Sequence, residues 1–217
     1  PISLAGALGA PNPSAEPDPD EDNLAIQKLA FETCVRINEV TPISATSLVT
    51  LALLGVGDQA LTIEEVRGAL VRLLDYVERR KLPTMGELDL RTEAGVTRAL
   101  DELVRSDVVA CYAEGPEAIY KIRADEHLAA AYYRNSVIHF FVTPAIAELA
   151  LLAAAGEGVT DRPAAFFDAA LRLRDLLKFE FFFPDRERFL AELRSEVAYH
   201  DADWEARLAG GADDVFG

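Results

Sequence analysis

The stretch LTIEEVRGALVRLLDYVERR, residues 61–80, predicts a clearly marked helix. Thr62 followed three positions later by Glu65 forms the pattern of a capping box, in which each side chain accepts a bond from the other residue's backbone N–H. Apolar residues then recur at spacings of three and four positions, at Val66, Leu70, Leu73, Leu74 and Val77. The stretch therefore predicts an amphipathic helix with one buried face.

A second helix and a hairpin follow this helix. Thr92 can cap a helix that carries Val96 and Leu100 on its apolar face. The runs VVACYA (108–113) and AIYKI (118–122) are rich in β-branched and aromatic residues and enclose a Gly-Pro turn, which is typical of a β-hairpin. Two helices followed by a hairpin predict a winged-helix topology.

The residues before this core predict a linker and two helices. PNPSAEPDPDED, residues 11–22, is rich in proline and acidic side chains, which predicts a surface loop or linker. A helical pattern follows over 23–40. Thr41 and Pro42 then form a suitable cap and first turn for a short buried helix that ends at Gly55.

Beyond residue 123 the sequence predicts helices almost to the end of the chain. Pro144, Pro163 and Pro184 stand where new helices are expected to open, because proline is tolerated in a first turn and disrupts a helix interior. The predicted fold is mainly α, with a helical bundle-like C-terminal region and a small winged-helix-like hairpin. The predicted parts are residues 1–22 (linker), 23–123 (helices and hairpin), 124–200 (bundle) and 201–217 (flexible tail).

The charge of the chain disfavours nucleic acid as a partner. Lysine and arginine number 21 against 37 aspartate and glutamate residues, a formal charge of −16. Such a field repels phosphate backbones. In the predicted winged helix, Arg98 and Arg105 are outnumbered by acidic neighbours, and the tip of the wing, AEGPE, is acidic. We therefore predict that no nucleic acid binds here.

The cysteines and the apolar segments predict core residues. Cys34 and Cys111 have no metal-ligand or disulfide spacing, so we expect reduced core residues in a cytosolic context. Residues 137–155 contain His139, Pro144 and Glu148, which are costly in a bilayer, so a transmembrane segment is not expected. In FEFFFP, the phenylalanines at 179, 182 and 183 are expected in the core rather than as an aromatic wedge in a membrane interface.

The polar run YYRNSVIHFF, residues 132–141, raises two alternatives. If residues 125–143 form one helix, each of its faces carries apolar residues, and the helix is expected to be buried on most sides. Buried Arg134, Asn135 and His139 must then find partners. They either pair with groups of neighbouring helices or form a site in which Arg134 faces a phosphate. No metal-ligand cluster, phosphate loop or nucleophile elbow is visible, so a metal and a cofactor are not expected.

Four stretches together resemble the C-terminal region of the PlsB-like glycerol-3-phosphate acyltransferases, in particular their actinobacterial form. They are PISL (1–4), CVRINEVTPISATSLVTLALLG (34–55), YYRNSVIHFF (132–141) and LLKFEFFFP (176–184). PISL is similar to the end of a phrase that closes the acyltransferase domain of this family. The chain also lacks an initiator methionine, so we expect it to be a segment of a longer protein.

The resemblance implies that the whole protein transfers a fatty acyl group from acyl-CoA, or acyl carrier protein, to glycerol 3-phosphate in phospholipid biosynthesis. It implies an upstream α/β acyltransferase domain as partner, and a peripheral location on the cytoplasmic face of the cell membrane. The family's catalytic motif is a histidine, four residues and an aspartate. Five positions after the three histidines stand Tyr132, Pro144 and Glu205, so we expect this segment alone to be inactive.

The resemblance also suggests a role for the polar run. Tyr133, Arg134, Asn135 and His139 are expected to brace the interface with the acyltransferase domain, and Arg134 to add positive charge near a substrate phosphate. The alternative is a stand-alone acidic winged-helix adaptor or regulatory protein. A helical solenoid is disfavoured because no repeat of fixed period is present.

Overall fold

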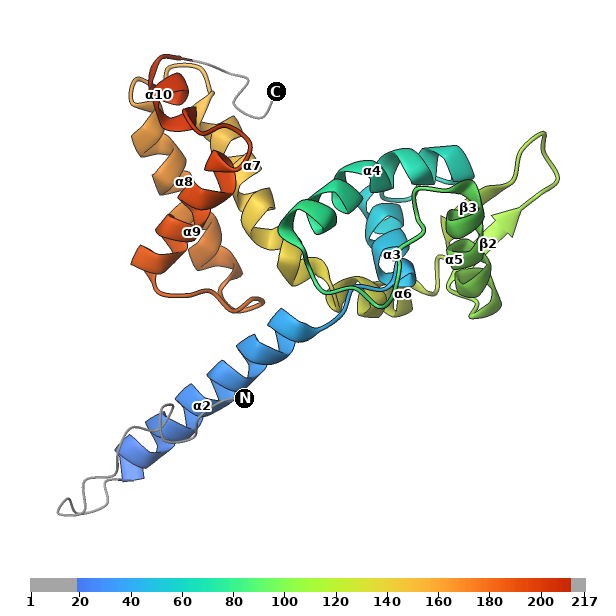
Figure 1. The fold of residues 1–217 in the computed structure, drawn as a ribbon, viewed down its shortest axis with the longest axis horizontal. Helices are drawn as coiled ribbons and strands as arrows, with labels where there is room; N and C mark the ends of the chain where they lie inside the picture. Colours follow the sequence, from blue (N-terminus) through green and yellow to red (C-terminus); the bar gives the residue numbers. More distant parts are fainter. Residues whose placement is uncertain (1–18, 212–217) are drawn as a thin grey trace. The chain divides into compact units, whose positions relative to one another are not determined.

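The computed structural model describes residues 19–211 of the chain, which divide into two compact units after Ile138 (Figure 1). The sequence placed this division after residue 123 instead. The difference arises because helix α6 (His127–Asn135) packs against helix α3 (Ala45–Gly55) and so belongs to the first unit.

The first unit has the winged-helix order of elements. Helix α3 packs against α4, α5 and α6, and the sheet has the antiparallel order β1-β3-β2, with Leu61 opposite Tyr120 and Val109 opposite Ile122. The mainly α fold and the hairpin are confirmed, whereas the short strand β1 was not predicted. The remaining elements of this unit are α2 (Pro19–Val40), β1 (Leu61–Thr62), α4 (Ile63–Arg80), α5 (Glu93–Arg105), β2 (Val109–Tyr112) and β3 (Ile119–Ile122).

The predicted caps of α4 and α5 are confirmed. Glu65 N donates to Thr62 Oγ1 at 3.2 Å, and Thr62 N donates to the Glu65 carboxylate at 2.8 Å. Gly95 N donates to Thr92 Oγ1 at 3.1 Å. These bonds satisfy N–H groups that a helix start leaves without intrahelical partners. The helices then turn the same apolar faces inward that the periodicity predicts, with Val66, Leu70, Val96 and Leu100 fully buried.

Two predictions for the N-terminal part are wrong. Residues 19–22 belong to α2 rather than to a linker, while residues 1–18 lie outside the described part of the chain. Ser44, not Thr41, caps α3. The chain is extended before α3 because Ile43 N donates to Pro83 O at 2.8 Å and Met85 N donates to Ile43 O at 2.8 Å, which holds Ile43 beside the loop that follows α4.

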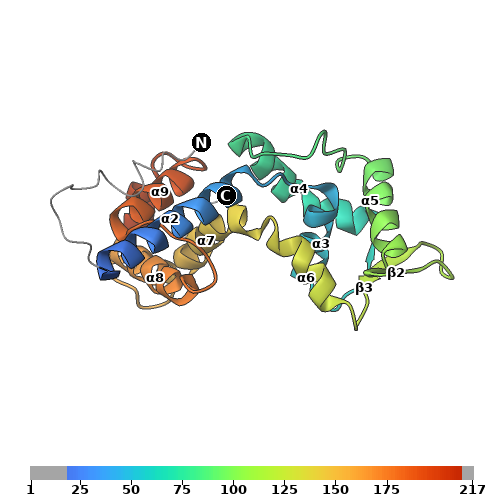
Figure 2. The same cartoon turned by 90° about the horizontal axis from the view of Figure 1, so that it is seen from below.

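The second unit is a small helical bundle. Helix α8 packs against α7 and α10, and α9 packs against α7; Figure 2 shows α7, α8 and α9. Asp161 caps α8 and Asp185 caps α9, each through a bond from a backbone N–H three residues later. Its elements are the 3-10 turn η1 (Ile138–Phe141), α7 (Val142–Ala154), α8 (Arg162–Leu177), α9 (Arg186–Ala198) and α10 (Trp204–Ala209).

Three predictions of burial or order are wrong. The expected flexible tail 201–217 contains α10, whose Trp204 is 2% exposed, whereas residues 212–217 lie outside the described part. Phe179 and Phe182 are 86% and 47% exposed rather than core residues. Both cysteines are free, but Cys111 is exposed and Cys34 only partly buried. In each case burial was predicted from the composition of the local sequence, whereas contacts with distant residues decide which side chains are covered.

Within residues 19–211, no single helix has both the length and the apolar composition needed to cross a membrane. Helix α6 and the segment Ile138–Ala154 meet those criteria only when they are taken together as one broken pair.

Candidate functional site

The predicted site residues do not lie on one helix. Tyr133, Arg134 and Asn135 form the last turn of α6 in the first unit, and His139 lies in η1. The helix breaks between them because Ser136 Oγ donates to Tyr133 O at 2.7 Å and Val137 N donates to Arg134 O at 3.0 Å. Bonds between residues three positions apart tighten the chain and end the α-helical pattern. The prediction of one helix over 125–143 is therefore wrong.

Arg134 and Asn135 are held to each other. Arg134 Nε and Nη2 donate to Asn135 Oδ1 at 3.1 and 2.9 Å, so both arms of the guanidinium fork meet one amide oxygen. Arg134 is partly buried and Asn135 is exposed. Because an amide oxygen is neutral, this pairing does not compensate the positive charge of Arg134, which stays available to an anion.

Helix α6 presents apolar side chains to solvent, contrary to the expectation that it would be buried on most sides. Leu128 is 88% exposed and Tyr132 is 77% exposed, and they stand four positions apart on one face. Ala130 is the buried residue of this helix. Tyr132 stands two positions before Arg134, so the exposed Leu-Tyr pair lies on a different side of α6 from Arg134 and can form part of a contact with another protein segment.

Two histidines of the described part, His127 and His139, have described neighbours. His127 Nε2 lies 3.8 Å from Asp58 Oδ1 at the start of α6, which is an exposed ion pair when the imidazole is protonated. The ring of His139 lies 4.0 Å from that of Phe140. No group of three or more His, Cys, Asp or Glu side chains within residues 19–211 is placed to hold a metal ion.

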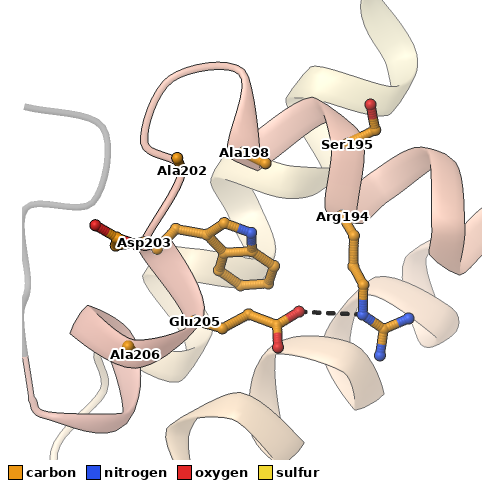
Figure 3. A pocket seen from close by; sticks show the side chains of 8 residues that line it. Arg194, Ser195, Ala198, Ala202, Asp203, Glu205 and Ala206 are labelled. Carbon is orange, nitrogen blue, oxygen red and sulfur yellow. Dashed lines mark hydrogen bonds and ion pairs between the residues drawn. The ribbon is translucent and has the colours of Figure 1, made fainter.

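A shallow hollow lies between α9 and α10 and was not anticipated from the sequence (Figure 3). Arg194 Nε donates to Glu205 at 3.1 Å, and its guanidinium lies 4.3 Å from the centre of the Phe167 ring. The hollow measures about 440 Å³ and also includes Ser195 and Trp204. Arg194 thus joins α9 to α10 through Glu205 and to α8 through Phe167. Because Glu205 compensates its charge and no histidine lines the hollow, we assign these contacts a structural role and not a catalytic one.

Comparison of the sequence with known protein families shows to which family these two units belong. The model of the family described as the glycerol-3-phosphate acyltransferase C-terminal region matches residues 1–212 of this chain. The chain belongs to this family. The resemblance inferred from the four stretches is thus confirmed over residues 1–212.

Relatives of this acyltransferase region come from mycobacteria and from Pseudomonas. The proteins named "Putative acyltransferase plsB1" of Mycobacterium bovis and Mycobacterium tuberculosis are 45% identical over 175 residues, which cover 79% of this chain and 28% of the relative. The "Glycerol-3-phosphate acyltransferase" of Pseudomonas aeruginosa is 37% identical over 141 residues, covering 62% of this chain and 16% of the relative. This acyltransferase C-terminal region spans less than a third of the length of these relatives.

Proposed function

We propose that the chain is the C-terminal part of a glycerol-3-phosphate 1-O-acyltransferase of phospholipid biosynthesis. The match of the family model to residues 1–212 carries this proposal. In the proposed reaction, the 1-hydroxyl of sn-glycerol 3-phosphate attacks the thioester carbonyl of acyl-CoA, or of an acyl carrier protein. The hydroxyl loses its proton, an ester forms, and the thiol of the donor leaves. No cofactor takes part.

In this proposal the chemistry belongs to an upstream acyltransferase domain, and residues 1–217 brace that domain. The absence of the family's catalytic motif after the three histidines supports this division of labour. The exposed Leu128 and Tyr132 on α6 supply an apolar surface for such a contact. The whole protein would act as a peripheral protein on the cytoplasmic face of the cell membrane, with acyl-CoA and glycerol 3-phosphate as its small-molecule partners.

The first test compares acyl transfer by this chain and by the same chain with its upstream polypeptide restored. We expect incorporation of radiolabelled acyl groups from acyl-CoA into glycerol 3-phosphate only with the longer protein, because none of the three histidines of the segment is followed by the aspartate of the family's catalytic motif. Circular dichroism would verify that both proteins are folded. Turnover by the short chain would contradict the division of labour, and two folded but inactive proteins would favour a winged-helix adaptor.

Arg134 is proposed to add positive charge near a substrate phosphate or at the interface between the domains. In the longer protein, Arg134→Ala should raise the Michaelis constant for glycerol 3-phosphate or acyl-CoA at least tenfold, since one charge-assisted hydrogen bond contributes about 1.5–3 kcal/mol. Arg105→Ala, an exposed arginine of α5, is the matched control. Unchanged Michaelis constants for both substrates, with unchanged stability, would refute the ligand role.

The charge of the winged-helix unit also disfavours nucleic acid as a partner. Its Arg98 is engaged by Asp89 at 2.7 Å, and Glu93, Asp101 and Glu102 are exposed along α5. A surface of this charge is unfavourable for phosphate contacts.

A further inference from the structure

Three large apolar side chains project from the end of α8 and from the connection between α8 and α9. Leu176 is 71% exposed, Phe179 is 86% exposed and Phe182 is 47% exposed, all within seven residues; we call these three the aromatic tip. The connection lies at the end of the second unit opposite α10 (Figure 1). Single exposed apolar residues are ordinary, but a group of large ones gathered at one place marks a contact surface.

The aromatic tip is held by a well-bonded support rather than by a loose loop. Arg174 Nη2 donates to Pro184 O at 2.5 Å, and its guanidinium lies 5.9 Å from the centre of Phe183 and 5.7 Å from that of Phe189. The rings of Phe183 and Phe189 are themselves in edge contact at 5.5 Å. Phe183 is therefore turned toward the bundle, while Phe179 is 86% exposed.

A second set of bonds closes the base of the same connection. Arg186 Nη2 donates to Asp175 Oδ2 at 2.6 Å, which joins the start of α9 to the end of α8 and lowers the pKa of Asp175 below its usual value. Glu180 N and Phe181 N both donate to Leu177 O, at 2.9 and 3.0 Å. These bonds fold residues 177–181 into a tight turn at the end of α8.

The charge around the aromatic tip differs from that of the chain as a whole. The segment 171–188 has five cationic and four anionic side chains, whereas the chain carries −16. Lys178 Nζ lies 5.4 Å from the centre of the Phe179 ring, so a cation and an aromatic ring stand together. Aromatic rings and lysines with long apolar stems are the side chains that settle at the boundary between lipid and water.

We infer that the aromatic tip inserts into the interface of a lipid bilayer. This inference rests on the peripheral membrane location proposed above. The residues that support it all lie in the second unit. A protein partner fits less well, because lysine is depleted from protein interfaces, whereas Lys178 stands beside the ring of Phe179.

A tryptophan at the tip reports insertion directly. Trp204 is the single tryptophan of the chain and is 2% exposed, so it serves as an internal reference. With phosphatidylcholine vesicles that carry brominated acyl chains, Phe179→Trp should give emission that shifts to the blue and is quenched, while the unchanged chain shows neither effect. An unchanged spectrum of the variant would overturn the inference.

Serine substitutions test whether the tip supplies the affinity. We expect Phe179→Ser with Phe182→Ser to lower the vesicle partition coefficient about tenfold or more, since membrane affinity follows buried apolar area. Leu149→Ser with Leu152→Ser, at two exposed leucines of α7, is the matched control and should leave partitioning unchanged. Equal loss in both double variants would overturn the inference.

The same fluorescence distinguishes a lipid from a protein as the occupant. If the emission of Phe179→Trp is unchanged by vesicles but shifts when the upstream polypeptide is restored, the tip is a domain contact and the lipid assignment is wrong. The readout is binding and not acyl transfer. A chain that binds vesicles but supports no acyl transfer in the longer protein would therefore refute the proposed enzyme and leave the tip intact.

Discussion

Replacing Trp204 by alanine is expected to destabilise the second unit by about 3–5 kcal/mol, the range for removing a large aromatic side chain from a core. The indole is 2% exposed and lies 4.9 Å from the ring of Phe166 and 6.0 Å from that of Phe167. Helix α10 has only six residues, which is too short for independent helical stability, so its order depends on this packing. Urea unfolding followed by circular dichroism would measure the loss.

The matched control for Trp204→Ala is Leu152→Ala in α7. Leu152 is 71% exposed, so its truncation removes little buried area and should change the free energy of unfolding by less than about 0.5 kcal/mol. Leu208, on the same short helix as Trp204, is 1% exposed, so its packing also contributes to the order of residues 201–211. If Trp204→Ala unfolded at the same urea concentration as the unchanged chain, α10 would not contribute to the stability of the unit.

Alanine at Gly95 is expected to destabilise the first unit by about 3 kcal/mol or more, since a new methyl group there has no room. A Cβ on Gly95 would overlap the carbonyl oxygen of Asp89 and lie 2.6 Å from its carbonyl carbon. That part of the loop cannot move freely, because Thr92 Oγ1 donates to the Asp89 carboxylate at 2.8 Å and Arg98 donates to it at 2.7 Å. These two bonds also hold the pKa of Asp89 below its usual value.

The control for Gly95→Ala lies on the neighbouring helix. Gly68 is exposed in the middle of α4, and a Cβ there would meet no atom within 4 Å. Gly68→Ala should therefore raise the free energy of unfolding by about 0.5–1 kcal/mol, because alanine loses less backbone entropy than glycine on folding. Hydrogen exchange at the amides of α5 assigns both effects to the first unit. Equal stability of the two variants would show that the contact with Asp89 relaxes freely.

The candidate site was only partly accessible to sequence reasoning. Tyr133, Arg134, Asn135 and His139 are site candidates because polar groups in an apolar run require partners, and their role at an interface stays a prediction. The bond from Arg134 to Asn135 depends on side-chain conformations that no spacing predicts. The hollow near Arg194 was missed because it joins α9 to a helix that composition assigned to a tail. A lone tryptophan in that tail was the available signal.

The sequence by itself determined the elements whose cause is local. Thr62, Thr92 and Asp185 cap the helices that follow them, because each oxygen reaches an N–H three residues ahead and needs nothing from the rest of the fold. The apolar face of α4 and the two long strands of the hairpin follow from periodicity for the same reason. The family, too, could be inferred from stretches of sequence read in order.

Tertiary structure alone decided which apolar side chains are covered. Phe183 is drawn in by Arg174 and Phe189, while Phe179, in the same run of sequence, is left 86% exposed. Likewise Trp204 is buried because Phe166 and Phe167 lie opposite it, and α6 ends early because the bonds around Ser136 tighten the chain. Burial depends on partners distant in sequence, and periodicity carries no information about whether such partners are present.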